Sequence, residues 1–181
     1  MKRMTTRFLM LGMALTVLFG CKKGGGITNF NMDYEATFVI QNGTGVSVPV
    51  SVLTPDIESN SESEFAVNDT RKDKIEHITL TSLSLEIVTP PGQEFDFLED
   101  IELFISADGL DEILLAYRYN MDNSVGTSVV LTCSQSDFQE YIKMDKFKLR
   151  VRTVSDEFNL NDVEIKILST FKVDAKLIGK G

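Results

Sequence analysis

The 181-residue chain carries 27 Asp and Glu residues against 18 Lys and Arg residues, a formal net charge of −9. Because nucleic-acid binding requires clustered basic residues, this acidic balance argues against nucleic acid as a partner. Hydrophobic residues make up 43% of the chain and charged residues 25%, which is typical of a globular protein and not of a disordered one.

The first twenty residues differ from the rest. Lys2, Arg3 and Arg7 give a basic start, and an apolar run follows over residues 8–19. About a dozen apolar residues extend about 18 Å as a helix, which is short of the roughly 30 Å hydrocarbon core of a membrane. A basic start, a short apolar run and a small final residue predict a secretory signal peptide over residues 1–20.

The end of this segment, Leu18-Phe19-Gly20-Cys21, resembles the lipobox of bacterial lipoproteins. In that family the signal is removed before the cysteine, whose sulfur is joined to diacylglycerol. The resemblance implies that Cys21 is the lipidation site and that acyl chains such as palmitate anchor the protein, since stable anchoring needs more than one chain. Phe19 is bulkier than the residue usual at its position. An ordinary signal peptide or an uncleaved anchor with an incidental cysteine is the alternative.

Residues 21–33 are expected to be the lipidated cysteine and a flexible leash, because Lys22-Lys-Gly-Gly-Gly26 has no helix or strand preference. Uncharacterised envelope lipoproteins of the Bacteroidetes type, which the segment resembles, carry acidic residues after the cysteine when they are exported to the cell surface. Lys22 and Lys23 stand there instead. The resemblance therefore implies an outer-membrane protein that faces the periplasm, with one folded domain over residues 34–181.

Strand-like segments dominate this domain. Residues 34–40 and 46–53 are rich in β-formers and flank Asn42-Gly43, so they predict a β-hairpin, with Pro49 at a sheet edge or a bulge. Residues 54–64 are polar, acidic and serine-rich, and predict a solvated loop.

Residues 68–70 could cap a short helical turn that ends at Lys74, and a strand is expected over residues 77–88. Ile78 and Leu80 have one phase in this strand, whereas Leu83 and the apolar residues after it have the other. A strand with one buried face must absorb an extra residue between the two phases. The pattern therefore predicts a β-bulge near Thr81-Ser82.

The second half of the domain repeats the strand signal. Strict alternation of apolar and charged residues over 147–153 and 163–173 predicts antiparallel strands with one buried face. Ser136 and Gln139 match a capping box for a short helix that extends to about Lys143. Further strands are expected at 101–105 and 113–117, joined by a hairpin at Asp108-Gly109, and at 128–133. About eight strands and at most one helix predict an all-β fold, an antiparallel β-sandwich, with a barrel of the same strands as the alternative.

Candidate catalytic groups are few. His77 is the only histidine, and no GxSxG, HExxH, P-loop or GxGxxG motif occurs. Two of the carboxylates Glu94, Asp96, Glu99 and Asp100 could form the acid and base of a glycosidase, but solvated charge around buried Phe95 and Phe97 explains them more simply. We therefore expect no catalytic residue.

Metal and thiol chemistry is equally sparse. Acidic loops that could bind calcium contain Asp108, Asp111, Glu112, Asn120, Asp122 and Asn123. Neither loop has the spacing of an EF-hand, and hairpin turns account for these residue types without a metal. Cys133 has no partner if Cys21 is lipidated, and its strand-like setting predicts a small buried apolar side chain. No metal and no cofactor are expected.

Charged and aromatic residues give two weaker signals. Lys148, Arg150 and Arg152 form a basic row on one strand, with Lys166 and Lys172 on the next, and are expected to pair with Asp162, Glu164 and Asp174. A groove for an anionic polymer is the alternative. The tyrosines Tyr34, Tyr117, Tyr119 and Tyr141 are the candidates for a glycan-binding platform.

These observations rank three functions. The leading hypothesis is a non-enzymatic, lipid-anchored envelope protein that serves as a structural or protein-interaction module. A module that binds a glycan or small ligand comes second. A hydrolase, which needs a clustered acid and base, comes third.

Overall fold

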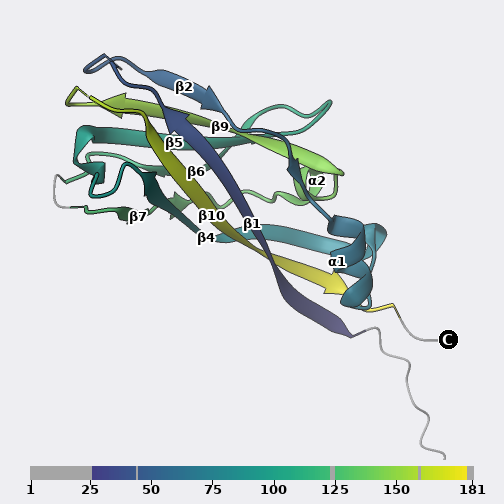
Figure 1. Ribbon diagram of the computed structural model, residues 1–181. Coiled ribbons are helices and arrows are strands. Elements are labelled where there is room, and N and C mark those ends of the chain that lie inside the picture. The colour runs from purple at the N-terminus through teal and green to yellow at the C-terminus, as the bar shows by residue number, and fades with distance from the viewer. Residues whose placement is uncertain (1–25, 44, 123–124, 159, 179–181) are drawn as a thin grey trace, which may run out of the picture.

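Two antiparallel sheets stack face to face over residues 26–43, 45–122, 125–158 and 160–178, which are those that the computed structural model describes (Figure 1). The four-stranded sheet has the order β1 (Ile27–Ile40), β10 (Val163–Lys176), β4 (Ile75–Thr89) and β7 (Ser128–Val130). The other sheet has the order β2 (Val50–Leu53), β9 (Lys146–Ser155), β5 (Leu98–Ser106), β6 (Ile113–Arg118) and β8 (Thr132–Cys133), with β3 (Ile57–Glu58) also on β9. The predicted antiparallel β-sandwich is confirmed.

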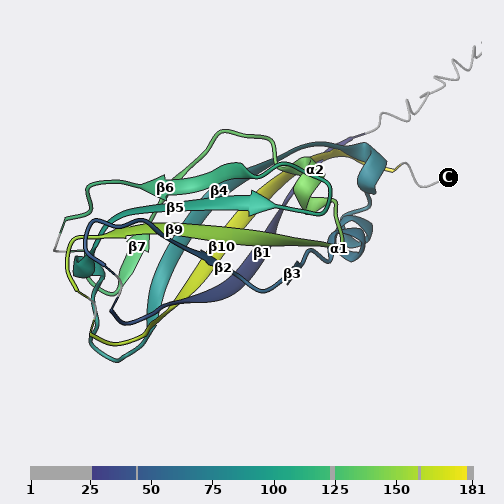
Figure 2. The ribbon, with the colours of Figure 1, turned by 90° about the horizontal axis from the view of Figure 1, so that it is seen from above.

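The core lies between the sheets, whose strands cross obliquely (Figure 2). Alternate residues of β9 and β10 point inward, as the sequence pattern predicts, and residues such as Leu149 and Ile167 are buried. β1 begins and β10 ends at the end of the sandwich that carries helix α1 (Ser61–Val67) (Figure 1).

The predicted β-bulge in β4 is confirmed. Leu80 lies opposite Phe171 of β10 and Ser82 lies opposite Thr170, so Thr81 is the extra residue. Thr81 and Ser82 are both exposed, whereas Leu80 and Leu83 on either side of them are buried. The bulge thus keeps both apolar sets of the strand on the core side.

The predicted hairpin at Asn42-Gly43 is wrong. β1 pairs with β10 along its whole length, and β2 pairs with β9 in the other sheet. The chain therefore crosses from one sheet to the other between these strands.

The folded domain starts earlier than the predicted residue 34, because β1 begins at Ile27 and includes residues 27–33, which were expected to belong to the leash. Their inner positions Phe30 and Met32 pack in the core. Cys21, Lys22 and Lys23 lie outside the described residues.

The segment expected to be a solvated loop contains α1, which covers one end of the core with the buried side chain of Phe65. A helical turn, η1 (Lys72–Lys74), lies where one was predicted, but no side chain of residues 68–70 caps it. The predicted short helix is α2 (Gln139–Ile142), but its N-cap residue is Phe138 and Ser136 does not cap it. The Gln139 amide at its start donates instead to Oδ1 of Asp137 at 3.0 Å. The strand expected over 128–133 changes sheets at buried Leu131 and so becomes β7 and β8.

Candidate binding surface

The outer face of the six-stranded sheet gathers tyrosine, arginine and glutamate side chains from three strands. The pleat turns Arg150 and Arg152 of β9 outward because Leu149, Val151 and Thr153 point into the core. In register, Arg152 lies opposite Glu102 of β5, and Glu102 lies opposite Tyr117 of β6. We call the following set the tyrosine–arginine face: Glu102, Phe104, Glu112, Tyr117, Tyr119, Arg150 and Arg152.

Glu102 is the centre of a three-residue chain on this face. Tyr119 donates its hydroxyl to one carboxylate oxygen at 2.6 Å, and Arg152 donates to the other at 2.6 Å. The hydrogen bond from Tyr119 is the largest cause that lowers the pKa of Glu102, and the bond from Arg152 adds to it, although partial desolvation acts in the opposite direction. The bond between Tyr119 and Glu102 also raises the pKa of Tyr119 to about 12. The Glu102 side chain is only 16% exposed, so the carboxylate is held in place beneath its two donors.

Arg150 is fixed by a carboxylate and a ring. It donates to both carboxylate oxygens of Glu112, from Nε at 3.0 and 2.9 Å. Its guanidinium also lies 4.2 Å from the ring centre of Phe104, a cation–π contact. The bond to Glu112 raises the pKa of Arg150, and the ion pair and the ring contact together hold its guanidinium in place.

The four tyrosines divide into two classes. Tyr117 and Tyr119 stack with ring centres 5.0 Å apart, and Tyr119 is 44% exposed. Tyr34 and Tyr141 are buried, and their hydroxyls donate to backbone carbonyls of Ser59 and Asp111. Only the first pair presents aromatic surface for a ligand.

The expected partners of the basic row are mostly wrong. β9 and β10 belong to different sheets, so Lys166 and Lys172 do not extend the row of Lys148, Arg150 and Arg152. Lys148 pairs with Asp56 at 3.2 Å, and the two arginines pair with Glu112 and Glu102. Lys172 lies 3.0 Å from Asp174, but both belong to β10, so this is not the expected pair between strands, and Lys166 pairs with Glu35. Because each cation of the row has a carboxylate partner, the face does not favour an anionic polymer.

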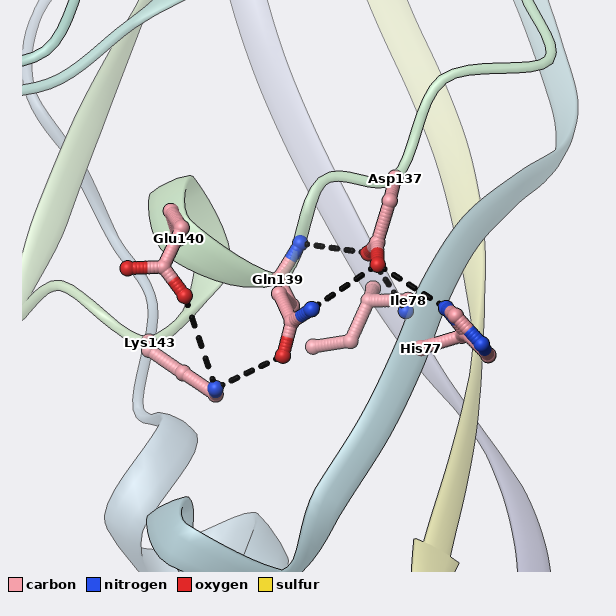
Figure 3. A network of polar contacts seen from close by, with 6 residues as sticks. All are labelled: His77, Ile78, Asp137, Gln139, Glu140 and Lys143. Carbon is pink, nitrogen blue, oxygen red and sulfur yellow. Dashed lines mark hydrogen bonds and ion pairs between the residues drawn. The ribbon is translucent and has the colours of Figure 1, made fainter.

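His77 belongs to a polar network that joins α2 to β4 (Figure 3). Its Nδ1 lies 2.9 Å from Oδ2 of Asp137, which also accepts hydrogen bonds from the Ile78 amide and from Gln139. Burial raises the pKa of Asp137, but these hydrogen bonds outweigh it and hold the pKa below its usual value. The His77 side chain is 67% exposed, and among the described residues no hydroxyl or thiol hydrogen-bonds to its ring. The arrangement serves as a structural tie between the two elements.

The acidic candidates do not converge on a reactive centre. Phe95 and Phe97 are buried in the turn η2 (Phe95–Phe97), so Glu94, Asp96 and Glu99 flank a buried aromatic pair as the simpler interpretation predicted. Asp100 accepts a hydrogen bond from the Asn120 amide at 3.0 Å. This contact gives Asp100 a structural role at the start of β5.

Neither calcium loop is supported by the geometry of its described residues. Glu112 is engaged by Arg150, and Asp108, Asp111 and Asp122 belong to no cluster of three or more His, Cys, Asp or Glu side chains suited to a metal within the described ranges. Asn123 lies outside these ranges. Cys133 is half-buried against the core, and burial raises the pKa of its thiol, so it is a small packing residue as predicted.

Three important residues escaped the sequence analysis. Glu102 and Phe104 alternate with the apolar positions of β5, so their outward direction was readable from the strand pattern. Their partners were not, because β5 and β9 are distant in the chain. Asp137 was hidden by the neighbouring Ser136, which fits the capping motif but does not cap the helix.

Comparison with known proteins assigns no family. No protein-family model and no curated protein matches the sequence. A chain from the structure of desmodium yellow mottle tymovirus is 11% identical, with 98% of this chain and 99% of that chain covered and a TM-score of 0.28. A chain from the structure of empty turnip yellow mosaic virus is 12% identical, with 98% of this chain and 92% of that chain covered and a TM-score of 0.29. A chain from the structure of cocksfoot mottle virus is 10% identical, with 99% of this chain and 98% of that chain covered and a TM-score of 0.29. Similarities this low identify neither a family nor a function.

Within the described residues, no helix has both the length and the apolar character needed to cross a bilayer.

Proposed function

We propose that this chain is a lipid-anchored protein of the cell envelope that catalyses no reaction and binds a partner protein through its tyrosine–arginine face. In this proposal Cys21 carries the lipid and holds the domain on the periplasmic side of the outer membrane. The observation that carries the proposal is the ordered cluster of exposed and half-buried tyrosine and arginine side chains on one sheet face.

The chemistry of this face suits a protein partner. Tyrosine and arginine are enriched among the residues that contribute most to protein–protein affinity. Tyr119 and Arg152 are both held by Glu102, and Arg150 is held by Glu112. Because these long side chains are already fixed, a partner would lose less side-chain entropy when it binds them.

The lipid anchor would hold the start of β1 close to the membrane. Five residues, 22–26, lie between Cys21 and the start of β1 at Ile27, and an extended chain of that length reaches at most about 20 Å. The partner is expected among the proteins of the cell envelope.

Site-specific photocrosslinking in cells tests the binding face. A photoreactive amino acid at Tyr119 should give a discrete protein adduct, whereas the same group at Glu86 of β4 in the opposite sheet, which is also exposed, should not. Arg152→Glu should remove the adduct from position 119, because it repels Glu102 and reverses the charge of the face. Equal adducts from positions 119 and 86, or none from position 119, would contradict the proposal.

The anchor requires a separate experiment. Cys21→Ser should release the protein from the membrane fraction and abolish incorporation of labelled palmitate. Retention of Cys21→Ser on the membrane with residues 1–20 removed would refute the assignment of Cys21.

The stacked pair Tyr117–Tyr119 favours glycan binding as a second candidate function, since aromatic faces and fixed charged hydrogen-bonding groups are both used to hold sugars. Titration with soluble oligosaccharides of the envelope distinguishes the two. Saturable binding that Tyr119→Ala abolishes and Tyr119→Phe retains would favour the glycan over the protein partner.

A further inference from the structure

One edge of the sandwich is open along its whole length. β1 forms the edge of the four-stranded sheet, and β2 and β3 form the neighbouring edge of the other sheet. β1 pairs with β10 over all of Ile27–Ile40 without a register shift, and no described strand pairs with its other side. A long regular edge strand presents a row of backbone donors and acceptors, and is a ready template for another strand.

Hollows follow this edge between the two sheets. One of about 290 Å³ is lined by residues of β1 from Asn31 to Tyr34 together with Ser59, Asn60 and Glu64. The next, of about 430 Å³, continues along β1 to Thr37 and is bounded by residues 55–58 and Asn60. A third, of about 500 Å³, lies between Val39 and β2. We call this row of hollows the β1 groove.

The floor of the β1 groove is rigid. Tyr34 spans the gap between the sheets, and its hydroxyl donates to the Ser59 carbonyl at 2.8 Å. Its ring packs edge-on against Phe147 of the other sheet, with ring centres 5.1 Å apart. The groove is therefore preformed and does not depend on a partner for its shape.

The walls of the groove are acidic at one end and mix apolar and uncharged polar residues at the other. No lysine or arginine lines the first two hollows. Five acidic residues do: Asp33, Glu35, Asp56, Glu58 and Glu64. Asp56 and Glu35 are paired with lysines outside the groove, but Glu58 and Glu64 have no ion-pair partner within the described residues. Val39, Val50, Val52 and Leu53 line the third hollow together with Gln41, Asn42, Gly43 and Ser51.

A second copy of the chain is a poor occupant. If two β1 strands paired antiparallel about a two-fold axis near the strand centre, Asp33 would lie opposite itself or opposite Glu35. Like charges directly opposite each other destabilise a strand pair. The same carboxylates would instead attract a strand whose outward side chains are basic.

We propose that the β1 groove binds an extended segment of a partner protein, in which lysine or arginine alternates with apolar residues, by adding it as a strand to the edge of β1. Main-chain hydrogen bonds to β1 supply affinity in this mode, and alternate side chains supply specificity. The basic side chains meet the carboxylates of Asp33, Glu58 and Glu64, and the apolar ones face Tyr34 and the valine-lined end. This site is separate from the tyrosine–arginine face and does not depend on it.

A synthetic peptide of alternating valine and lysine tests the proposal on the full-length chain in detergent. NMR should show saturable binding, with slower hydrogen exchange for β1 amides that exchange rapidly in the free protein. The double variant Glu58→Lys/Glu64→Lys should weaken binding roughly tenfold, because two attractions become repulsions. Glu86→Lys, a matched charge reversal on the exposed face of β4, should change it less than twofold.

Four outcomes would overturn the inference. They are equal binding of a valine–glutamate peptide, unchanged binding to the double variant, peptide-induced shifts confined to Tyr117 and Tyr119, or concentration-dependent protection of β1 without peptide, which would indicate a second copy. Tyr119→Ala should leave peptide binding intact. Failure of the tyrosine–arginine face and failure of the β1 groove therefore give different results.

Discussion

Deleting Thr81 should remove the bulge of β4 and leave both faces of the strand unchanged. In the native pairing Leu80 lies opposite Phe171 and Ser82 lies opposite Thr170, so Thr81 has no position of its own on β10. Without it, Ser82 follows Leu80 directly and every other pair keeps its register. The apolar residues Ile78, Leu80, Leu83 and Leu85 then alternate strictly and remain in the core.

The cost of this deletion should be small. Thr81 is exposed, and within the described residues its side chain donates one hydrogen bond, from Oγ1 to the Thr170 carbonyl at 3.0 Å. Loss of such a bond costs about 1 kcal/mol, which lowers the melting temperature of a domain of this size by about 2–4 °C.

Deletion of Ser84 is the matched control, because it removes one small residue of the same strand. The shortened strand can keep Leu80 and Leu85 opposite their native partners on β10 if Thr81 takes up a paired position and the bulge disappears. Ser82 then occupies the buried position that Leu83 has in the native strand. Leu83 is fully buried, and truncation of a buried leucine costs about 2–5 kcal/mol, a large part of the roughly 5–15 kcal/mol that stabilises a domain. The Ser84 deletion should therefore be less stable than the Thr81 deletion by at least about 2 kcal/mol.

Equilibrium urea unfolding followed by circular dichroism measures both free energies of unfolding, provided that the slope with urea stays constant. Equal losses in the two variants would refute the argument. A greater loss of stability in the Thr81 deletion would also refute it. That result would mean that the sandwich requires the extra twist of the bulge, and not the shift of the apolar residues to the core side.

Two further predictions concern single side chains. Thr153 is 2% exposed and its hydroxyl has no hydrogen-bond partner within the described residues, so Thr153→Val should stabilise the domain by about 1 kcal/mol in the same assay. The control Thr170→Val loses the hydrogen bond to Asp33 and should not stabilise the domain. A loss of stability in Thr153→Val would show that the Thr153 hydroxyl does have a hydrogen-bond partner, and would contradict the prediction. Because the folded-state pKa of Glu102 is lowered, its carboxylate stabilises the fold above the ordinary pKa of about 4.3, and this contribution is lost as the pH falls through the folded value. Glu102→Gln should therefore be less stable than the wild type at pH 7 and approach it as the pH falls below about 4; a pH-independent difference would contradict this sign.

The successes and failures of the sequence analysis have a common physical basis. The bulge at Thr81, the alternating faces of β9 and β10 and the hairpin from β5 to β6 follow from the side-chain period of a strand and from turn residues, which act over a few neighbours. The hairpin at Asn42-Gly43 failed although its turn residues were suitable, because β1 gains more by pairing with the whole of β10. Helix α1 was missed because Phe65 is its one fully buried large side chain, which gives no helical period.

The sequence alone was sufficient for the all-β class, the antiparallel sandwich and the phase of most strands, since one buried and one solvated face leave a local pattern. It also carried the lipobox resemblance at Cys21, which remains a prediction. The tertiary structure alone decided which strands are neighbours, and so brought Tyr119, Glu102 and Arg152 together and left the edge of β1 open. Those arrangements depend on contacts between residues far apart in the chain, which the local alternation of side chains does not specify.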